Sequence, residues 1–310
     1  MTGPGQSRAG FEAWRRRYTA VIDAGLDRAL RRLDLARKGL ASLSEAMRYA
    51  LLGGGKRFRP LLALAAAEAV GGRARAALPL ALAVEMIHAY SLIHDDLPAM
   101  DDDDIRRGRP TCHKVFGEGP AILAGDALLT LAFATLAGTQ RPSAGRLNQA
   151  AAFLTRGAGA AGMVGGQILD LALERRNGPI PPKEIRGMER LKTGALIAAA
   201  LAGGAALAGG GPADLRRLWR LGLDLGLAFQ IRDDLLNLSG NPALTGKAVG
   251  SDAARGKATL PALLGPAAAE REMRALNRKI IAKVGIFQAR GRSLAALITT
   301  LDERQSWQNS

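Results

Sequence analysis

Long apolar segments with helical spacing alternate along the chain with short clusters of glycine and proline. Alanine and leucine, the strongest helix formers, dominate these segments, and no run of alternating β-branched residues indicates a strand. The breaks fall at residues 53–55, 71–72, 117–120, 141–142, 177–182, 209–212 and 240–242. Because the breaks are short, they predict roughly ten helices joined by tight loops, which is an all-α helical bundle.

The chain has 310 residues and shows neither an internal repeat nor a composition shift that would mark a second domain. We therefore expect a single domain, 1–310, with disordered polar ends at 1–10 and 305–310. The first ten residues contain no apolar leader. The longest apolar run, 195–211, is interrupted by glycine and is shorter than the roughly 20 residues that span a bilayer. We expect no membrane span.

Composition and charge narrow the class of protein further. Hydrophobic residues make up 48% of the chain and aromatic residues only 4%, so the core should consist of aliphatic side chains. The net charge is +15, but the arginines are scattered and do not alternate with aromatic residues. We therefore expect no nucleic-acid partner. The positive electrostatic field of the protein should attract anionic substrates. The single cysteine, Cys112, is expected to be a packed side chain in a reducing, cytoplasmic protein.

The first acidic motif follows a predicted helix over residues 81–97. On it His88, Ser91 and Asp95 share one face, and Asp95 and Asp96 stand among apolar residues. Pro98 should end the helix near Leu97, which lets Asp101 fold back beside Asp95. Buried carboxylates repel one another unless a cation gathers them, and oxygen ligands without His or Cys favour Mg²⁺. Residues 102–104 are interpreted as a solvated acidic loop.

A second acidic motif lies on a later helix, where Gln230, Asp233 and Asn237 share one face. Asp233 is a candidate ligand for another Mg²⁺. Basic residues precede or follow both motifs. Some stand in loops, and Lys192, which is followed by Thr193, stands at a predicted helix start. The remaining candidates are Lys56, Arg59, Arg106, Arg107, Lys247 and Lys257. Together they could neutralise a metal-bound diphosphate.

Six ordered blocks make the sequence resemble the trans-isoprenyl diphosphate synthases, and most closely the bacterial farnesyl diphosphate synthases. The resemblance covers about residues 43–264. The blocks are 54–60, 88–113, 165–170, 192–194, 229–237 and 246–259. The family implies a helical bundle around a deep central cavity, usually homodimeric, that condenses isopentenyl diphosphate with allylic diphosphates.

The resemblance also implies a role for each matching residue. Asp95 and Asp101 would bind two Mg²⁺ ions with support from Asp96, and Asp233 would bind the third. The allylic diphosphate and its metals would be bound by Arg106, Lys192, Thr193, Gln230, Lys247 and Lys257. The diphosphate of isopentenyl diphosphate would be bound by Lys56, Arg59, His88 and Arg107. Departure of pyrophosphate would leave an allylic cation in an apolar cavity, where water is excluded.

Product length should depend on side chains along the helix that carries Asp95, since one turn of about 5.4 Å approximates one isoprene unit. Tyr90 resembles the bulky cavity floor of bacterial farnesyl diphosphate synthases, and Ser91 is small. We therefore expect a C15 product, with geranylgeranyl or geranyl diphosphate as alternatives. Alternatively, Tyr90 only packs between helices.

One residue departs from the family pattern, because the second motif ends in Asn237 where Asp is usual. Loss of this negative charge should raise the Mg²⁺ requirement without abolishing activity. Two other classes stay open. One is a non-catalytic prenyl-diphosphate-binding subunit, which degraded motifs would favour. The other is a class I terpene cyclase, against which the second diphosphate site (Lys56, Arg59 and His88) argues.

Overall fold

The computed structural model describes residues 8–33, 40–140, 142–238 and 258–302. In its first half the helices are α1 (Arg8–Arg31), α2 (Ala41–Leu52), α3 (Phe58–Ala69), α4 (Leu78–Asp95), α5 (Cys112–Phe116), α6 (Glu118–Ala137) and α7 (Ala144–Ala158). In its second half they are α8 (Met163–Glu174), α9 (Pro182–Glu189), α10 (Ala195–Leu207), α11 (Pro212–Leu238), α14 (Leu260–Leu264), α15 (Pro266–Val284) and α16 (Arg292–Asp302).

Short elements connect these helices. Two 3₁₀ turns, η1 (Ala74–Ala77) and η3 (Gly285–Gly291), precede α4 and α16, and a π-helical turn, η2 (Arg190–Gly194), joins α9 to α10. In the described ranges the strands are limited to one antiparallel hairpin of β1 (Ile105–Arg106) and β2 (Arg109–Pro110). The expected all-α class is therefore confirmed.

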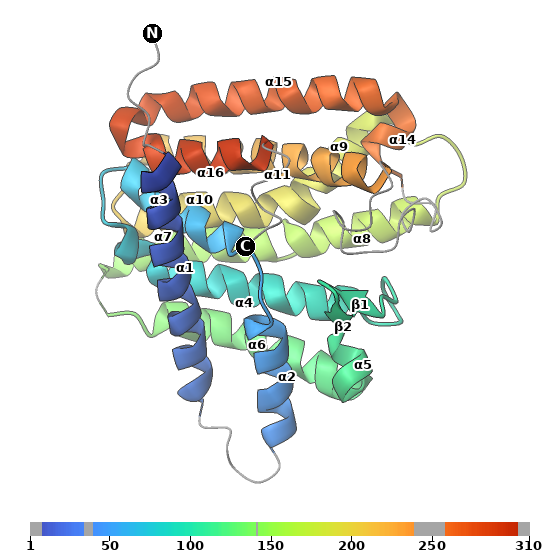
Figure 1. Cartoon of the computed structure of the whole chain (residues 1–310), viewed down its shortest axis with the longest axis horizontal. Coiled ribbons are helices and arrows are strands. Elements are labelled where there is room, and N and C mark those ends of the chain that lie inside the picture. Colours follow the sequence, from blue (N-terminus) through green and yellow to red (C-terminus); the bar gives the residue numbers. More distant parts are fainter. Residues whose placement is uncertain (1–7, 34–39, 141, 239–257, 303–310) are drawn as a thin grey trace.

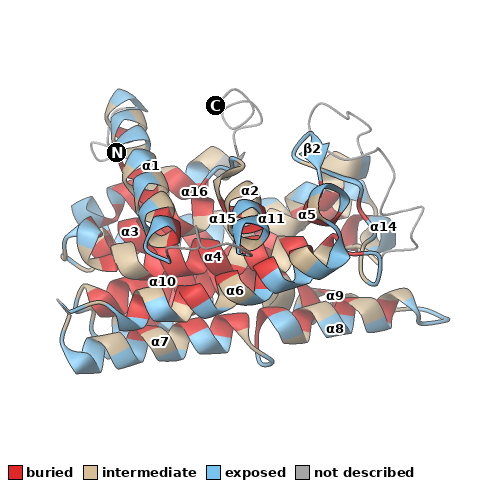
Figure 2. Ribbon diagram, turned by 90° about the horizontal axis from the view of Figure 1, so that it is seen from below, coloured by how far each residue is buried: buried red, intermediate tan, exposed pale blue. Residues whose placement is uncertain are grey.

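Most of the long helices lie along the long axis of the molecule, while α1 and α2 cross them steeply (Figure 1). Helix α10 lies at the centre of the bundle, and all of its residues are buried (Figure 2). It packs against α3, α7 and α11. A methyl group on Gly204 would lie 2.4 Å from the carbonyl oxygen of Ala63, so α3 and α10 approach through backbone atoms. Small residues thus allow the aliphatic core to close tightly.

Two expected boundaries differ slightly from the observed ones. The helix expected over residues 81–97 begins earlier, at Leu78, where Pro79 suits a first turn, and ends at Asp95. Residues 8–10 are already helical, because Phe11 starts a buried stripe on α1. Residues 1–7 and 303–310 lie outside the described part of the chain.

Three helical stretches are long and apolar enough to cross a membrane by length and composition: Ala74–Asp95, Glu118–Ala137 and Pro182–Leu207. The first and third are 67% and 83% buried within the protein, as expected for core helices. The stretch in α6 is only 39% buried. Length and composition therefore identify more candidates than the single apolar run 195–211, and α6 carries an exposed apolar surface.

Candidate active site

The first acidic motif forms a closed turn at the end of α4. The Asp101 amide donates a hydrogen bond to the Asp95 carbonyl at 2.8 Å, and Asp102 has a left-handed φ of 49°. The predicted helix end before Pro98 is therefore confirmed, and the chain does turn back so that Asp101 lies beside Asp95. Asp can adopt this backbone conformation with little strain.

The pKa of Asp95 is raised to about 6, chiefly by burial and also by the neighbouring carboxylates Asp101 and Asp96, although Lys192 lowers it. This carboxyl group is thus half-buried among other acids. Such crowding favours a bound cation over a set of free carboxylates.

Asp96 has a different environment, because it is 3% exposed and accepts a hydrogen bond from Nε of Arg106 at 2.6 Å. Arg106 also bonds Asp103 at 3.3 Å. Burial lowers the pKa of this guanidinium, but Asp96 and Asp103 outweigh the effect and the pKa is raised. Asp103 is therefore a buried partner of Arg106, which differs from the solvated loop expected for residues 102–104, whereas Asp102 and Asp104 are exposed.

Lys192 lies within the π-helical turn η2, and not at the start of a helix as expected. A π-helical turn adds one residue per turn inside an otherwise continuous helix, so the helical pattern of the sequence continues through it. The ammonium group donates to Asp170 on α8 at 2.5 Å. Burial lowers the pKa of Lys192, but Asp170, Asp95 and Asp101 raise it well above its usual value. The cation is thus held between α8 and the first acidic motif.

The second acidic motif lies on α11, as expected, and is connected to η2. The Thr193 hydroxyl donates to Gln230 at 3.2 Å, and the Gln230 amide donates to Asp234 at 2.9 Å. A methyl group on Gly226 would lie 2.2 Å from Cα of Gly194, so α11 meets η2 through backbone atoms one turn before Gln230. This close packing places Lys192, Thr193 and Gln230 in one region.

The glycine-rich segment before α3 brings a group of cations to the same region. Nη1 of Arg59 lies 3.2 Å from Nε2 of His88, and Arg107 donates to the Gly54 carbonyl at 2.7 Å. Burial lowers the pKa of Lys56, the nearby Arg232 lowers it further, and Asp233 raises it. Lys56 therefore connects this cluster electrostatically to the second acidic motif.

Burial and the surrounding arginines determine the charge of this cluster. They lower the pKa of His88 well below its usual value, so its ring is neutral near pH 7. Burial lowers the pKa of Arg59 to about 10, while Glu85 raises it and Arg107 lowers it. Nε of Arg59 is buried without a hydrogen-bond partner in the described chain. An unsatisfied buried donor beside several cations suits an anionic ligand.

Tyr90 and Ser91, the expected determinants of product length, lie on α4 before the first motif. Tyr90 is 7% exposed, and its ring meets that of His94 edge-on with the centroids 5.7 Å apart. The Ser91 hydroxyl donates to the His88 carbonyl at 3.0 Å. Lys247 and Lys257 lie outside the described residues.

Sequence reasoning assigned no role to several residues that hold the site together. Asp170 accepts a hydrogen bond from Lys192, and Asp234 accepts one from Gln230. Both acids lie within the motif blocks of the sequence. Arg57 is 4% exposed and bonds Asp23 at 2.7 Å and Glu85 at 2.8 Å, which fixes the glycine-rich segment to α1 and α4. In the sequence, the ion pair between Arg57 and Glu85 could have been suspected from Glu85, because an acid inside an apolar helix usually has a partner.

Comparison with known proteins agrees with this geometry. The family model described as polyprenyl synthetase matches residues 41–290. The farnesyl diphosphate synthase of Geobacillus stearothermophilus is 45% identical over 256 residues, which cover 82% of this chain and 84% of that protein. Geranylgeranyl pyrophosphate synthase 3 of Arabidopsis thaliana is 42% identical over 263 residues, 82% of this chain and 70% of that protein.

A geranyltransferase from Helicobacter pylori, solved in complex with magnesium and isoprenyl diphosphate, superposes with a TM-score of 0.83 at 28% identity. The alignment covers 98% of this chain and 99% of that structure. The resemblance inferred from the motif blocks is therefore confirmed, and the chain belongs to the polyprenyl synthetase family.

Proposed function

We propose that this protein is a short-chain prenyltransferase that condenses isopentenyl diphosphate with dimethylallyl and geranyl diphosphate to give farnesyl diphosphate. The proposal rests above all on one arrangement, in which two carboxylate motifs face two groups of cations. Lys192 acts electrostatically on Asp95 and Asp101, and Lys56 on Asp233. Elements far apart in the sequence thus supply opposite charges to one region, as binding of two diphosphates with metal ions requires.

Asp95, Asp101 and Asp233 are the proposed ligands of Mg²⁺, with three ions in each active site. The ligand atoms are carboxylate oxygens without His or Cys, which suits Mg²⁺, and the pKa of Asp95 is raised to about 6, chiefly by burial. When bound, Mg²⁺ stabilises the negative charge of the departing pyrophosphate. Asp96 would position Arg106 through the bond between them.

We assign the two diphosphates to different residues. Lys56, Arg59, His88 and Arg107 would bind isopentenyl diphosphate, because Arg59 has an unsatisfied buried donor and His88 is a neutral hydrogen-bonding group among arginines. The allylic diphosphate would be bound by Arg106, Lys192, Thr193 and Gln230, together with Lys247 and Lys257. Two separate diphosphate sites argue against a terpene cyclase, which needs only one.

Farnesyl diphosphate is the proposed product because buried Tyr90 lies one to two turns before Asp95 and would stop the growing chain. Relatives of comparable identity are named as farnesyl or as geranylgeranyl synthases, so overall similarity does not decide between C15 and C20. The choice therefore depends on this side chain.

The proposed assembly is a cytoplasmic homodimer without nucleic-acid or membrane partners. The outer faces of α6 and α8 expose large apolar side chains: Ile122, Leu123, Val164, Ile168 and Leu169. Leu123 and Ile168 are 59% and 63% exposed. Exposed apolar surface of this kind favours a protein interface in soluble proteins.

The experiment that tests this function is incubation of the purified protein with Mg²⁺, labelled isopentenyl diphosphate and each allylic primer, followed by chromatography of the products. Extension of dimethylallyl and geranyl diphosphate that stops at C15 supports the proposal, whereas a C20 product keeps the enzyme class and rejects the assigned length. No extension over a wide range of Mg²⁺ would instead indicate a non-catalytic subunit.

A matched pair of variants on α11 tests the assigned chemistry. Asp233→Asn should lower kcat by roughly 100-fold or more, since one charged metal ligand is lost. Asp214→Asn makes the same change near the start of the same helix, where Asp214 pairs with exposed Arg217 at 3.3 Å, and should leave the rate unchanged. Equal rates for both variants would contradict the role of Asp233.

A further inference from the structure

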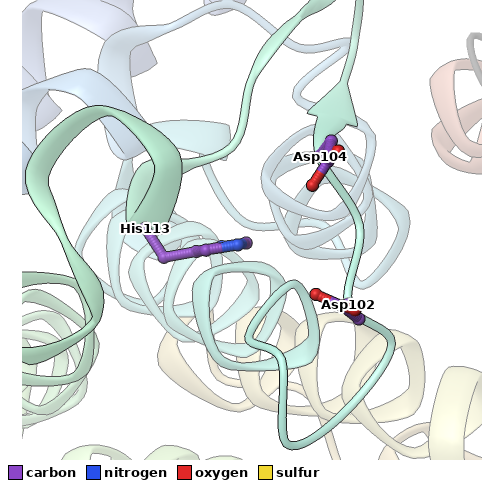
Figure 3. Close-up of side chains that lie close together, drawn as sticks. All are labelled: Asp102, Asp104 and His113. Atoms are coloured by element: carbon purple, nitrogen blue, oxygen red, sulfur yellow. The ribbon is translucent and has the colours of Figure 1, made fainter.

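Asp102, Asp104 and His113 form a compact group outside the residues assigned to the diphosphates. One possible ligand atom from each lies within 4.8 Å of the others. Figure 3 shows the imidazole ring pointing toward the space between the two carboxylates. Both acids are exposed, whereas the histidine is buried, so the group is open on one side.

The β1–β2 hairpin explains why these residues meet. Ile105 pairs with Pro110, and the Thr111 amide donates to the Asp104 carbonyl at 2.9 Å, so the chain before β1 lies against the chain after β2. His113 follows in the first turn of α5. The left-handed φ of Asp102 turns the preceding loop back toward the same point. Regular backbone hydrogen bonds therefore bring the three side chains together.

His113 supplies an observation independent of the two acids. Its side chain is 6% exposed, and Nε2 is buried without a hydrogen-bond partner within the described chain. Nδ1 lies 3.1 Å from the hydroxyl of Thr111, which is itself 2% exposed. When Nδ1–H donates to this oxygen, Nε2 presents a lone pair toward the carboxylates. Histidine ligands of metals are commonly held in this way by a second hydrogen bond.

We propose that Asp102, Asp104 and Nε2 of His113 bind a transition-metal dication of the zinc class, at a site distinct from the Mg²⁺ motifs. An imidazole with two carboxylates suits Zn²⁺ and similar ions, while Mg²⁺ prefers oxygen ligands alone. Solvent on the open side supplies the remaining ligands. The bound ion satisfies the otherwise unpaired Nε2, which is costly to leave buried.

Lys114 is the one competing cation that contacts the group among the described residues, with Nζ 2.7 Å from Asp104. This pair is exposed, and exposed pairs contribute little to stability. A carboxylate also has two oxygens, so Asp104 can bind a metal through one and keep Lys114 on the other. A metal here would connect the turn that follows Asp101 to α5, and so stiffen the loop beside the first acidic motif.

Equilibrium dialysis of the chelator-treated full chain against Zn²⁺, in excess Mg²⁺, tests the proposal. We expect one zinc per chain, and a visible absorption band of imidazole-bound Co²⁺ when cobalt is used as the probe. Asp102→Asn and Asp104→Asn change exposed residues and should leave folding intact, yet weaken Zn²⁺ binding by at least roughly tenfold. Thr111→Val should weaken it by about 10- to 100-fold through the lost hydrogen bond.

Two controls separate this site from its surroundings. Asp101→Asn should retain the zinc, because Asp101 belongs to the Mg²⁺ motif, and His94→Gln should retain it because that ring lies on α4. His113→Gln should lose both the zinc and the cobalt band. No stoichiometric zinc in the unmodified protein, or zinc lost in Asp101→Asn but kept in Asp104→Asn, would overturn the proposal.

Discussion

Gly166 on α8 meets the backbone of Lys192 so closely that a methyl group on it would lie 2.1 Å from the Lys192 amide nitrogen. The same two elements are joined by the bond from Lys192 to Asp170, one helical turn after Gly166. Glycine therefore allows the π-helical turn to sit against α8, and Asp170 then fixes the direction of the ammonium group.

Gly166→Ala should thus be strongly destabilising and should lower activity, because backbone atoms cannot move aside as a flexible side chain can. We expect a loss of roughly 1–3 kcal/mol in the free energy of unfolding, measured by urea denaturation. Gly187→Ala is the matched control, since a methyl group there meets nothing within 4 Å. At this exposed position of α9 the substitution should stabilise the fold by up to about 1 kcal/mol. Changes of the same sign would contradict the close contact at Gly166.

Asn237→Asp should lower the Mg²⁺ concentration that gives half-maximal rate, because it returns a negative charge to the surroundings of the third metal ion. Initial rates measured over a Mg²⁺ series provide the test, with an expected shift of roughly three- to tenfold. Asn148→Asp adds the same charge on the exposed face of α7 and should cause no shift. An unchanged requirement in Asn237→Asp would reject this explanation.

Tyr90→Ala should lengthen the product from C15 to C20 or beyond, because it removes the buried ring one to two turns before Asp95. Tyr90→Phe keeps the ring and should still give C15. The cavity left by alanine costs about 3–5 kcal/mol, so circular dichroism must first confirm that the variant is folded. Folded Tyr90→Ala protein that still stops at C15 would assign Tyr90 to helix packing alone.

Cys112 should react slowly with iodoacetamide in the folded protein. Burial, with a smaller contribution from Asp96, raises the pKa of the thiol to about 11. Since the folded pKa is raised, the folded state holds the proton more tightly, and this stabilisation is complete below about pH 9 and lost as the pH rises toward 11. At pH 8 the thiolate fraction, and hence the alkylation rate, should be roughly 100-fold lower than in urea. Equal rates in the two conditions would show that the thiol is not shielded.

The sequence predicted the helical class and the parts of the site that depend on local rules. The turn after Asp95 followed from Pro98, and the shared face of Gln230 and Asp233 followed from helical spacing. Both features depend on a few neighbouring residues, whose backbone preferences can be assessed without knowledge of the rest of the fold.

The partners of the charged residues could not be predicted in the same way. The bonds from Lys192 to Asp170 and from Arg57 to Asp23 join different helices, and many acids would have been equally plausible partners. The π-helical turn at Lys192 packs closely against Gly166 and Gly226, which lie on two other helices. Asp103 was expected in a solvated loop, because its neighbours in the sequence are acidic. In the structure it is buried beside Arg106.

Because α6 exposes an apolar outer surface, the stability of this protein should depend on its concentration. If a second copy covers Leu123 and its neighbours, folding and association are one equilibrium, and the melting temperature should rise as the protein is concentrated. Dilution would then expose the same surface and favour aggregation of the separated chains. The activity of a very dilute preparation should accordingly decay with time, and added protein should protect it.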